Sequence, residues 1–324
     1  MRNILKTNFL KKNTVWDTYE KIPSDVSSRH YARLRNGNET QILMDCPLSE
    51  NPDRFVAVDL FLQKMGLRVP KILAHDLENG FILEEDFGND TLTKVLLRGT
   101  PAFPVYKKAI CALAKLQSQE VPQNCILSPY SEDEILKEAV HLTDWYIPFA
   151  GGGKLSEKAR DEFIGIWKNL IPKMMDVPKR VMLFDCHVDN LMVLPDGSIG
   201  FIDFQDAKIG PVTYDLLSLL EDIRLEVPLS LQQQIFELYF SLHPSFQTKA
   251  FELSYDIGAC LRHTRVLGSF TKFYLELGKE KCLNYYDVLW RLLEARLKRP
   301  ELKEYKMWIE TYIPREKRGR PVKR

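Results

Sequence analysis

The sequence predicts an α+β fold in two parts, a small β-rich N-terminal part and a larger, mainly helical C-terminal part. Short strand-like runs separated by turn sequences fill residues 18–86. From residue 91 onward, apolar residues recur at helical spacing in long segments. One strand–turn–strand pattern interrupts the helical part at residues 183–207, where packing alone does not require it. This interruption is the first indication of a functional site.

The composition is that of an ordinary globular protein. The chain has 324 residues, of which 45% are hydrophobic, and this is enough for a sizeable core in two lobes. The 45 Lys and Arg residues nearly balance the 44 Asp and Glu residues, so no overall field favours nucleic acid or an anionic membrane. Partners therefore have to be inferred from local sites.

The cysteines and the N-terminus predict a cytoplasmic protein. The six cysteines are scattered and form no C-x-x-C pair, which is typical of a reduced, intracellular protein and argues against a structural zinc site. The N-terminus is basic but lacks the apolar core and cleavage site of a signal peptide. No stretch reaches the roughly 18 apolar residues that a membrane-spanning helix needs, so no membrane partner is expected.

The N-terminal part begins with a helix and then contains two predicted hairpins. Asn36-Gly37 separates the runs RHYARL and TQILMD, and Asn-Gly is a strong signal for a two-residue hairpin turn. A helical segment follows, DRFVAVDLFLQKMG. In the second hairpin, Glu78-Asn79-Gly80 separates KILAHD from FILEED. Residues 1–88 are therefore expected to form one small, mainly β lobe.

The helical part is expected to span residues 89–313. Apolar residues recur at helical spacing in PVYKKAICALAKLQ, EDEILKEAVHLTDWYI, EKARDEFIGIWKNLIPKMM and most of residues 212–312. The segment 183–207 is the only β element that the pattern supports here. Residues 314–324 are basic and unpatterned, which predicts a disordered tail.

The strand–turn–strand segment LFDCHVDNLMVLPDGSIGFIDFQDA gathers polar residues at its open end. With Pro195-Asp196-Gly197 as the turn, antiparallel pairing brings Asn190 and Asp203 about one strand spacing apart. Two oxygen-bearing side chains at this spacing suit Mg²⁺, which takes a few protein oxygens and completes its shell with water and phosphate. Asp185 lies in the loop that enters the hairpin, and it can face the same point without being a ligand.

An Asp five residues ahead of a metal-binding Asn, with a second metal-binding Asp after a hairpin, is the arrangement that kinase-type phosphoryl transfer needs. One carboxylate accepts the proton of the acceptor hydroxyl, and the other groups hold metal on the β- and γ-phosphates. Asp185 is thus the candidate catalytic residue, and Asn190 and Asp203 are the candidate metal ligands. Taken singly, Asp185 could be a surface loop acid and Asn190 a turn residue.

These residues resemble the aminoglycoside phosphotransferase and choline kinase-like family, a branch of the protein kinase-like fold. Within it, DCHVDNLMVLPDG followed by GFIDFQDAKIGPVTYDLLSLLED is most similar to the bacterial anomeric kinases of N-acetylmuramate and N-acetylglucosamine. The segments DVSSRHYARL, QILMDCP, FILEEDFG, DWYIP and RHTRVLGSF also resemble that group, so the likeness covers nearly the whole chain. It implies a bilobal protein kinase-like fold with a catalytic β-hairpin in the helical lobe.

The resemblance also implies a reaction and its cofactors. Asp185 matches the catalytic Asp of the family, and Asn190 and Asp203 match its two metal-binding residues. ATP and Mg²⁺ are the implied cofactors. The implied reaction transfers the γ-phosphate to a hydroxyl of a small molecule. The nearest group phosphorylates the anomeric hydroxyl of N-acetylmuramate or N-acetylglucosamine in peptidoglycan recycling.

The adenine of ATP is expected at the junction of the two lobes. Glu84, Glu85 and Asp86 match the hinge of the family, which would hold adenine through backbone groups. The phosphates would then lie under the hairpin that contains RHYARL.

Two positions depart from the protein kinases. Leu183 stands where they have a His two residues before the catalytic Asp, and Met44 stands where they have a phosphate-binding Lys. Because a triphosphate needs cationic compensation, another residue must replace that Lys. Ser27, Arg29 and Arg33 share one strand face at a period of two and are the candidate phosphate contacts, Arg29 above all. Without the resemblance, both arginines would be interpreted as solvated charges of an exposed hairpin.

Three further residues are candidate substrate contacts. His187 could touch the acceptor, and a hydrogen-bonded structural histidine is the competing interpretation. Trp145 and Tyr146 could stack on the apolar faces of a pyranose, although their spacing also fits the apolar face of a helix. The helical lobe, including residues 138–153, is expected to set acceptor specificity.

The sequence leaves several alternatives open. The same branch includes kinases of aminoglycosides, choline and homoserine, so the acceptor could be another small alcohol. Met44 and Leu183 also fit a catalytically silent nucleotide-binding regulator. The basic KRGRPVKR at 317–324 resembles an AT-hook, a segment that binds the minor groove of DNA, but a solvated tail is the expected interpretation. Nucleic acid is therefore not the expected partner, and the oligomeric state stays open.

Overall fold

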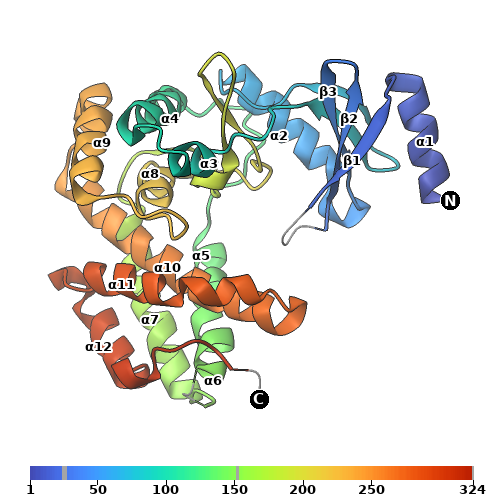
Figure 1. Cartoon of the computed structure of the whole chain (residues 1–324). Helices are drawn as coiled ribbons and strands as arrows, with labels where there is room; N and C mark the ends of the chain where they lie inside the picture. The colour runs from blue at the N-terminus through green and yellow to red at the C-terminus, as the bar shows by residue number, and fades with distance from the viewer. Residues whose placement is uncertain (24–27, 151–152, 323–324) are drawn as a thin grey trace.

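The protein has two lobes, a sheet lobe and a larger helical lobe (Figure 1). The computed structural model describes residues 1–23, 28–150 and 153–322. The strands of the N-terminal lobe form one sheet, and long helices make up most of the remaining chain. The expected bilobal α+β architecture is confirmed.

A five-stranded antiparallel sheet, in the order β1-β2-β3-β5-β4, forms the centre of the N-terminal lobe. Both expected hairpins form, across Asn36-Gly37 and across the turn that ends at Gly80. Gly80 has a φ of 72°, and a Cβ there would lie 2.0 Å from the carbonyl oxygen of Cys46, so only glycine fits. The strands are β1 (Thr18–Ile22), β2 (His30–Asn36), β3 (Glu39–Asp45), β4 (Ile72–Asp76) and β5 (Phe81–Glu85).

The two faces of this sheet pack against different helices. The helix α1 (Arg2–Asn13) covers the outer face, and α2 (Pro52–Lys64) covers the inner face, so the sheet lies between them (Figure 1). On the inner side, Phe55 and Val58 of α2 belong to the core that continues into the helical lobe. The outer cluster consists of Phe9, Leu10, Leu34, Leu43, Phe81 and Leu83.

Local sequence determines where the helices α2 and α5 begin. Before α2, the side chain of Asn51 accepts a hydrogen bond from the N–H of Arg54, and Pro52 occupies the first turn. The helix α5 (Glu132–Ala139) starts with a capping box that Ser131 and Glu134 form. Both starts follow from residues that satisfy the unpaired N–H groups of a first turn.

The helical lobe is built around α10 (Lys249–Leu277), which crosses it and packs against α7, α8 and α11 (Figure 1). A π-helical turn, Leu142–Tyr146, joins α5 to α6 (Ile147–Phe149). The other helices are α3 (Leu92–Leu97), α4 (Ala102–Gln117), α7 (Glu157–Met174), α8 (Thr213–Leu220), α9 (Leu229–Leu242), α11 (Tyr286–Arg296) and α12 (Lys303–Tyr312).

Gly268 lets α10 come close to the segment that follows α5. A Cβ at this position would lie 2.1 Å from the carbonyl group of His141, so a larger residue would force the two helices apart. This contact aligns α10 with the π-helical turn from which Trp145 and Tyr146 come.

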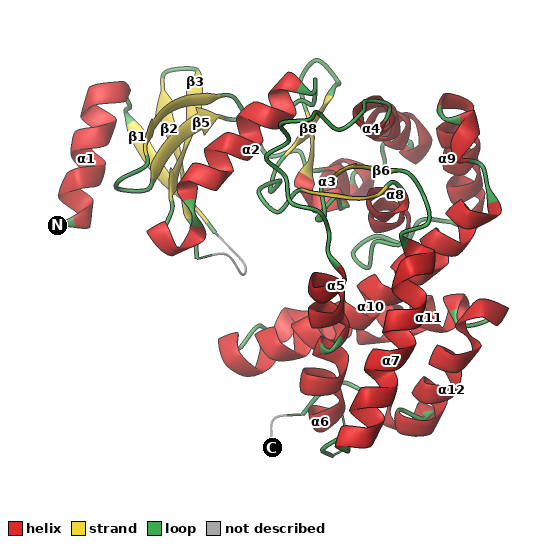
Figure 2. Cartoon of the chain, turned by 180° about the vertical axis from the view of Figure 1, so that it is seen from behind, coloured by secondary structure: helices red, strands yellow, loops and turns green. Residues whose placement is uncertain are grey.

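Among its described residues the helical lobe holds two strand pairs, one more than the sequence pattern indicated (Figure 2). β7 (Leu191–Val193) and β8 (Ile199–Phe201) form the expected hairpin, with Leu191 opposite Phe201. β6 (Lys179–Met182) and β9 (Lys208–Pro211) form a second antiparallel pair that flanks it. The expectation of a single β element was wrong, because tertiary contact pairs two short runs that are distant in the sequence.

The C-terminal segment packs against the helical lobe as far as Val322, so the expectation of a disordered tail was wrong. The guanidinium of Arg318 lies 5.0 Å from the ring centroid of Trp290, and its Nη1 donates to Glu294 at 2.5 Å. The N–H of Val322 donates to the backbone oxygen of Phe149 at 3.0 Å. Arg318 belongs to the RGRP segment, and its engagement within the protein argues against insertion into a DNA groove.

The six cysteines all lie within the described ranges, and none of them forms a disulfide. In those ranges no helix combines the length and the apolar character that are needed to cross a bilayer.

Candidate active site

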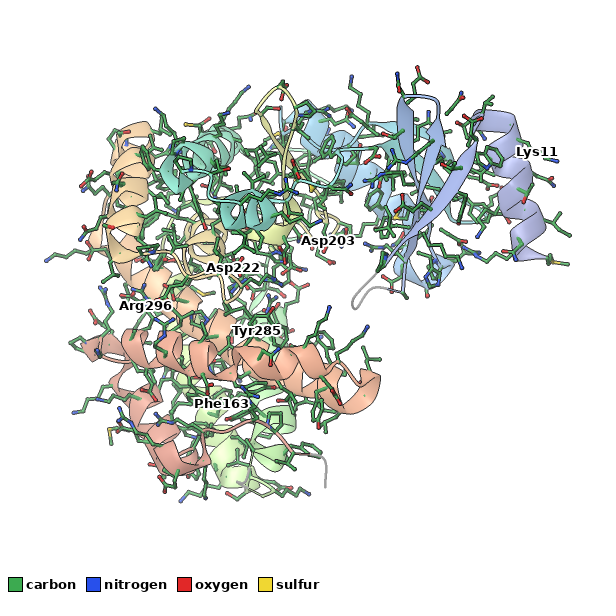
Figure 3. The ribbon with its side chains drawn as sticks, viewed as in Figure 1. Lys11, Phe163, Asp203, Asp222, Tyr285 and Arg296 are labelled. Carbon is green, nitrogen blue, oxygen red and sulfur yellow. The ribbon has the colours of Figure 1, made fainter. Side chains whose placement is uncertain are left out.

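The loop between β6 and β7 places Asp185 and Asn190 beside Asp203, which follows β8. The side-chain nitrogen of Asn190 donates to the backbone oxygen of Asp185 at 2.9 Å and lies 3.5 Å from Oδ2 of Asp203. Asp203 lies between the two lobes (Figure 3). The structure therefore brings together the three side chains that the sequence singled out, because the antiparallel register of the hairpin returns its second strand to the catalytic loop.

Two buried carboxylates behind this loop hold it in place. Asp215 of α8 accepts the N–H groups of Leu183 at 2.7 Å and of Phe184 at 3.1 Å. Asp222, just after α8, accepts the N–H of Val188 at 3.0 Å. Phe184 has a φ of 74°, a strained conformation for any residue other than glycine. These bonds therefore hold a strained backbone immediately before the candidate catalytic residue.

The sequence did not predict that Asp215 and Asp222 brace the catalytic loop. From the sequence, Asp215 is expected only as an acid at the start of a helix, and Asp222 is not singled out. Both residues are charged positions in the leucine-rich run TYDLLSLLED, and both are almost completely buried. Buried carboxylates need hydrogen-bond donors, so acids in a leucine-rich helical run were the signal that could have indicated their role.

Asp185 lies in surroundings that favour its charged form. Burial works against the charge, but the neighbouring cations, above all Arg265, outweigh it and hold the pKa of Asp185 below its ordinary value. Nη2 of Arg265 lies 3.5 Å from Oδ1 of Asp185, and the Asp185 side chain is 34% exposed. A charged and accessible carboxylate is suited to orient a hydroxyl and to accept its proton.

Asp203 faces the same point from the other side of the loop. It has a φ of 58°, and its Oδ1 accepts a hydrogen bond from Nε2 of Gln205 at 2.9 Å. Burial, with a further contribution from the charge of Asp185, raises the pKa of Asp203 above its ordinary value. A divalent cation at this point would relieve the repulsion between the two carboxylates.

Asn190 and Asp203 fit a hard divalent cation. Because the amide nitrogen of Asn190 donates to the loop backbone, its Oδ1 is the atom left for a cation beside Asp203. Mg²⁺ suits such a pair when phosphates and water complete its shell. In the described part of the chain, no cluster of three or more His, Cys, Asp or Glu side chains is arranged to hold a metal ion. The candidate site is therefore one that bound phosphates would help to form.

Arg29 is the arginine that the structure places above this point. Its Nη1 lies 3.9 Å from Oδ1 of Asp203, and its Nη2 lies 3.5 Å from Glu50. The guanidinium also lies 5.9 Å from the ring centroid of Phe55 in α2. This position, on the sheet side of Asp203, is where a cation could contact the phosphates.

Arg33 is held at the hinge by Asp86, so the prediction that it contacts the phosphates was wrong. Nε and Nη2 of Arg33 bind both carboxylate oxygens of Asp86, at 2.5 and 2.9 Å. Nη2 also donates to the backbone oxygen of Gly88 and Nη1 to the side chain of Asn89, at 2.9 and 2.8 Å. A bidentate pair of this kind fixes the guanidinium where the lobes join. The third candidate, Ser27, lies outside the described residues.

The other two hinge residues have different surroundings. Glu85 binds Nη1 of Arg68 at 2.7 Å, and Arg68 holds the pKa of Glu85 below its ordinary value. Glu84 is 7% exposed, and its Oε2 has no hydrogen-bond partner among the described residues. Burial, with help from the nearby Asp59 of α2, raises the pKa of Glu84 to about 8. Burial also raises the pKa of Asp59 to about 7.

Glu84 is expected to make the stability of the protein fall as the pH rises. Between the ordinary pKa of 4.5 and about 8, the unfolded chain releases the Glu84 proton and the folded chain keeps it, so unfolding becomes easier. Glu84→Gln removes this effect and should stabilise the protein by roughly 4 kcal/mol at pH 7.5 and by less than about 1 kcal/mol at pH 5. Thermal and denaturant unfolding from pH 5 to pH 8 measures the difference.

A suitable control for Glu84→Gln is Glu20→Gln. Glu20 lies on β1 with its side chain 62% exposed, and its pairing with Arg35 is a surface interaction. Glu20→Gln should change the free energy of unfolding by less than about 0.5 kcal/mol, as is usual for a surface substitution. If Glu84→Gln is no more stable than the wild type at any pH, the raised pKa of Glu84 is wrong.

The three candidate substrate contacts differ in accessibility. Tyr146 is fully buried and stacks on Tyr286, with ring centroids 5.7 Å apart, so it is a core residue and its expected contact with substrate was wrong. Trp145 is partly buried, and Nζ of Lys272 lies 5.2 Å from its ring centroid. Burial lowers the pKa of His187 to about 4, and its Nδ1 has no hydrogen-bond partner among the described residues.

A sheet lobe that joins a helical lobe, with a loop Asp and two further oxygen-bearing side chains between them, is the arrangement of a phosphotransferase of the protein kinase-like class. Residues 18–248 match the model of the Phosphotransferase enzyme family, and the chain belongs to that family. The family that the sequence resembled is thus confirmed. The protein is an enzyme that uses a nucleotide and transfers phosphate to an alcohol group.

Individual relatives agree with this assignment. The N-acetylmuramate/N-acetylglucosamine kinase of Caulobacter vibrioides is 29% identical over 98% of each chain. The enzyme of the same name from Pseudomonas aeruginosa is 33% identical over 87% of this chain and 84% of its own. Choline kinase LicA from Streptococcus pneumoniae superimposes with a TM-score of 0.64, at 16% identity, over 90% of this chain and 98% of that chain. ADP-bound aminoglycoside phosphotransferase APH(2'')-Ib has a TM-score of 0.63, at 14% identity, over 90% and 96%.

Proposed function

We propose that the protein is an ATP- and Mg²⁺-dependent amino-sugar kinase that phosphorylates the anomeric hydroxyl of N-acetylmuramate or N-acetylglucosamine in peptidoglycan recycling. The observation that carries the proposal is the meeting of Asp185, Asn190 and Asp203 below Arg29. The names of the relatives, which match this chain over most of its length, supply the acceptor class. The intact set of three residues also argues against a catalytically silent regulator.

Each residue of the site has a task in this reaction. Asp185 orients the acceptor hydroxyl and receives its proton while the bond to the γ-phosphate forms. An anomeric hydroxyl is more acidic than an ordinary alcohol, so it demands less of this carboxylate. Mg²⁺ held by Asn190 and Asp203 would supply positive charge to the β- and γ-phosphates. Arg29 offsets the remaining charge from the sheet side.

The nucleotide and the acceptor would reach the site from different lobes. Backbone groups of Glu84, Glu85 and Asp86 are the proposed contacts of adenine. On the acceptor side, Arg265 and Lys272 of α10 are seven residues apart and therefore project from the same face of the helix, about 10 Å apart along its axis. Arg265 contacts Asp185, so an acceptor bound at Asp185 can extend along α10 toward Lys272.

Lys272 is a suitable partner for a carboxylate on the acceptor. Its side chain is 38% exposed, and its carboxylate neighbour Glu276 lies at 3.9 Å, near the limit of an ion pair. The ring of Trp145 lies beneath Lys272, with Nζ 5.2 Å from the ring centroid, which is within the range of a cation–π contact. N-acetylmuramate carries a carboxylate, whereas N-acetylglucosamine is neutral. Lys272 therefore favours the acidic sugar in this proposal.

A panel of acceptors tests the proposed function. The protein would be incubated with ATP, Mg²⁺ and, in separate reactions, N-acetylmuramate, N-acetylglucosamine, choline, homoserine and an aminoglycoside. The expected products, identified by mass, are the phosphorylated amino sugars. Phosphorylation of another alcohol and of neither sugar would reject the acceptor but leave the mechanism standing. ATP binding without turnover of any acceptor would favour the silent regulator.

Lys272→Gln is expected to separate the two sugars. Loss of one charge-assisted contact should raise the KM for N-acetylmuramate about 10-fold and leave kcat/KM for N-acetylglucosamine within about twofold. Lys306→Gln is the matched control, because Lys306 of α12 is 46% exposed and also lies near a carboxylate one turn away, that of Glu310 at 3.8 Å. An equal effect of Lys272→Gln on both sugars would contradict a carboxylate contact.

A further inference from the structure

Arg265, in the middle of α10, stands between two carboxylates beside the catalytic loop. Its Nη2 lies 3.5 Å from Oδ1 of Asp185, and its Nη1 lies 3.6 Å from Oε2 of Glu138 in α5. The side chain is 13% exposed. A guanidinium buried to this extent is costly unless carboxylates compensate it, so the pair Asp185 and Glu138 determines where it can lie.

Aromatic rings fix the orientation of this guanidinium. Its Cζ lies 4.5 Å from the ring centroid of Phe184, which stacks on Tyr214 with centroids 5.7 Å and planes 6° apart. Glu138 is itself held by the hydroxyl of Tyr130, which donates to it at 2.7 Å. Phe184 is the strained residue directly before the candidate catalytic residue. Arg265 therefore contacts the catalytic loop through both a ring and a carboxylate.

Arg262, Arg224 and His187 also act electrostatically on Asp185, but they lie farther from its carboxylate than Arg265 does. Arg224 pairs with Asp189 at 3.1 Å and with Asp222 at 3.2 Å. His187 is neutral near pH 7, because burial lowers its pKa to about 4. Within the described ranges, Arg265 is the one Lys, Arg or His side chain that comes within 4.0 Å of the carboxylate of Asp185.

We propose that Arg265 is a positioning residue, which holds the carboxylate of Asp185 toward the acceptor hydroxyl and couples the catalytic loop to the helices α5 and α10. This role rests on the proposed function, in which Asp185 receives the proton of the acceptor. A planar guanidinium can contact two carboxylates and a ring at once, whereas an ammonium group acts as a point charge. Without Arg265, Asp185 can rotate away from the hydroxyl, while the ATP contacts in the sheet lobe stay in place.

Two substitutions of Arg265 test the position of Asp185. Arg265→Met keeps much of the apolar stem against Phe184 and should lower kcat about 100-fold, because a small displacement of a reacting group has an effect of this size. The KM for ATP and the directly titrated ATP affinity should stay within about twofold. Arg265→Lys should recover part of the loss, roughly 10-fold, since it restores the charge but not the fork.

A double mutant separates positioning from general damage. If Arg265 acts through Asp185, Arg265→Met combined with Asp185→Asn should be no slower than Asp185→Asn alone, measured under single-turnover conditions at high enzyme concentration. Losses that multiply would show that Arg265 acts independently of Asp185. That result would overturn the proposal.

Arg318→Met is the matched control for Arg265→Met. Arg318 also lies over an aromatic ring, pairs with a carboxylate and is 8% exposed, but it lies in the C-terminal segment. It should lower the unfolding temperature and leave kcat unchanged. A wild-type kcat for Arg265→Met, or a loss matched by an equal loss of ATP affinity, would overturn the role of Arg265. Full activity of Asp185→Asn would instead overturn the proposed function.

Discussion

Asp185→Asn is expected to lower kcat for phosphoryl transfer about 1,000-fold while ATP still binds. Asparagine has nearly the same shape as aspartate but cannot receive the hydroxyl proton, and loss of a general base has effects of 10²–10⁴-fold. The hydrogen bond from Asn190 goes to the backbone oxygen of Asp185, so the substitution leaves that bond in place. Product formation at saturating ATP and a separate ATP titration measure the two quantities.

A neighbouring carboxylate provides the control for this experiment. Asp189 lies in the same loop, but its side chain binds the hydroxyl of Thr93 and Nε of Arg224 at 2.5 and 3.1 Å. Asp189→Asn should keep kcat within a few-fold of the wild type. If Asp185→Asn and Asp189→Asn lose similar activity, Asp185 has no special part in proton transfer.

Asp215→Ala is expected to lower both stability and activity. The carboxylate accepts two backbone N–H groups, and without it the donors of Leu183 and Phe184 stay buried and unpaired. We expect the free energy of unfolding to fall by about 2–4 kcal/mol, from two unmet donors. The strained backbone at Phe184 should relax as well, which would displace the catalytic loop and lower kcat at least about 10-fold. Denaturant unfolding and steady-state kinetics measure the two effects.

An ordinary acid at the start of a helix provides the control for Asp215→Ala. Asp53 is exposed and lies in the first turn of α2. Its interaction with the helix dipole is worth less than about 1 kcal/mol, so Asp53→Ala should have a small effect on stability and none on kcat. If Asp215→Ala has effects on stability and kcat as small as those of Asp53→Ala, Asp215 is only an acid at the start of α8, as the sequence suggests, and does not brace the loop.

The turn residues in the sequence were enough to predict the three hairpins. Asn36-Gly37 and the turn at Gly80 predict two hairpins of the N-terminal sheet, because few residues adopt a positive φ without strain. Pro195-Asp196-Gly197 predicts the third hairpin, and antiparallel pairing across it is sufficient to bring Asn190 and Asp203 together.

Contacts between distant residues could not be predicted in this way. Arg33 and Asp86 share a sheet face and a hinge only after β2 and β5 are in place, so the pattern of alternating residues assigned Arg33 to the phosphates. Tyr146 fits an apolar helical face and an aromatic platform for a sugar equally well, and only packing against Tyr286 distinguishes them. The pairing of β6 with β9 likewise has no local signal.

By itself the sequence determined the two-lobed fold and the meeting of the hairpin residues, since helical periodicity and turn chemistry act over a few residues. Only the tertiary structure decided how Asp185 is held. Its brace Asp215 lies 32 positions from Leu183, and its partner Arg265 lies 80 positions from Asp185. Such contacts depend on which helix faces pack together, and no pattern of neighbouring residues specifies that packing.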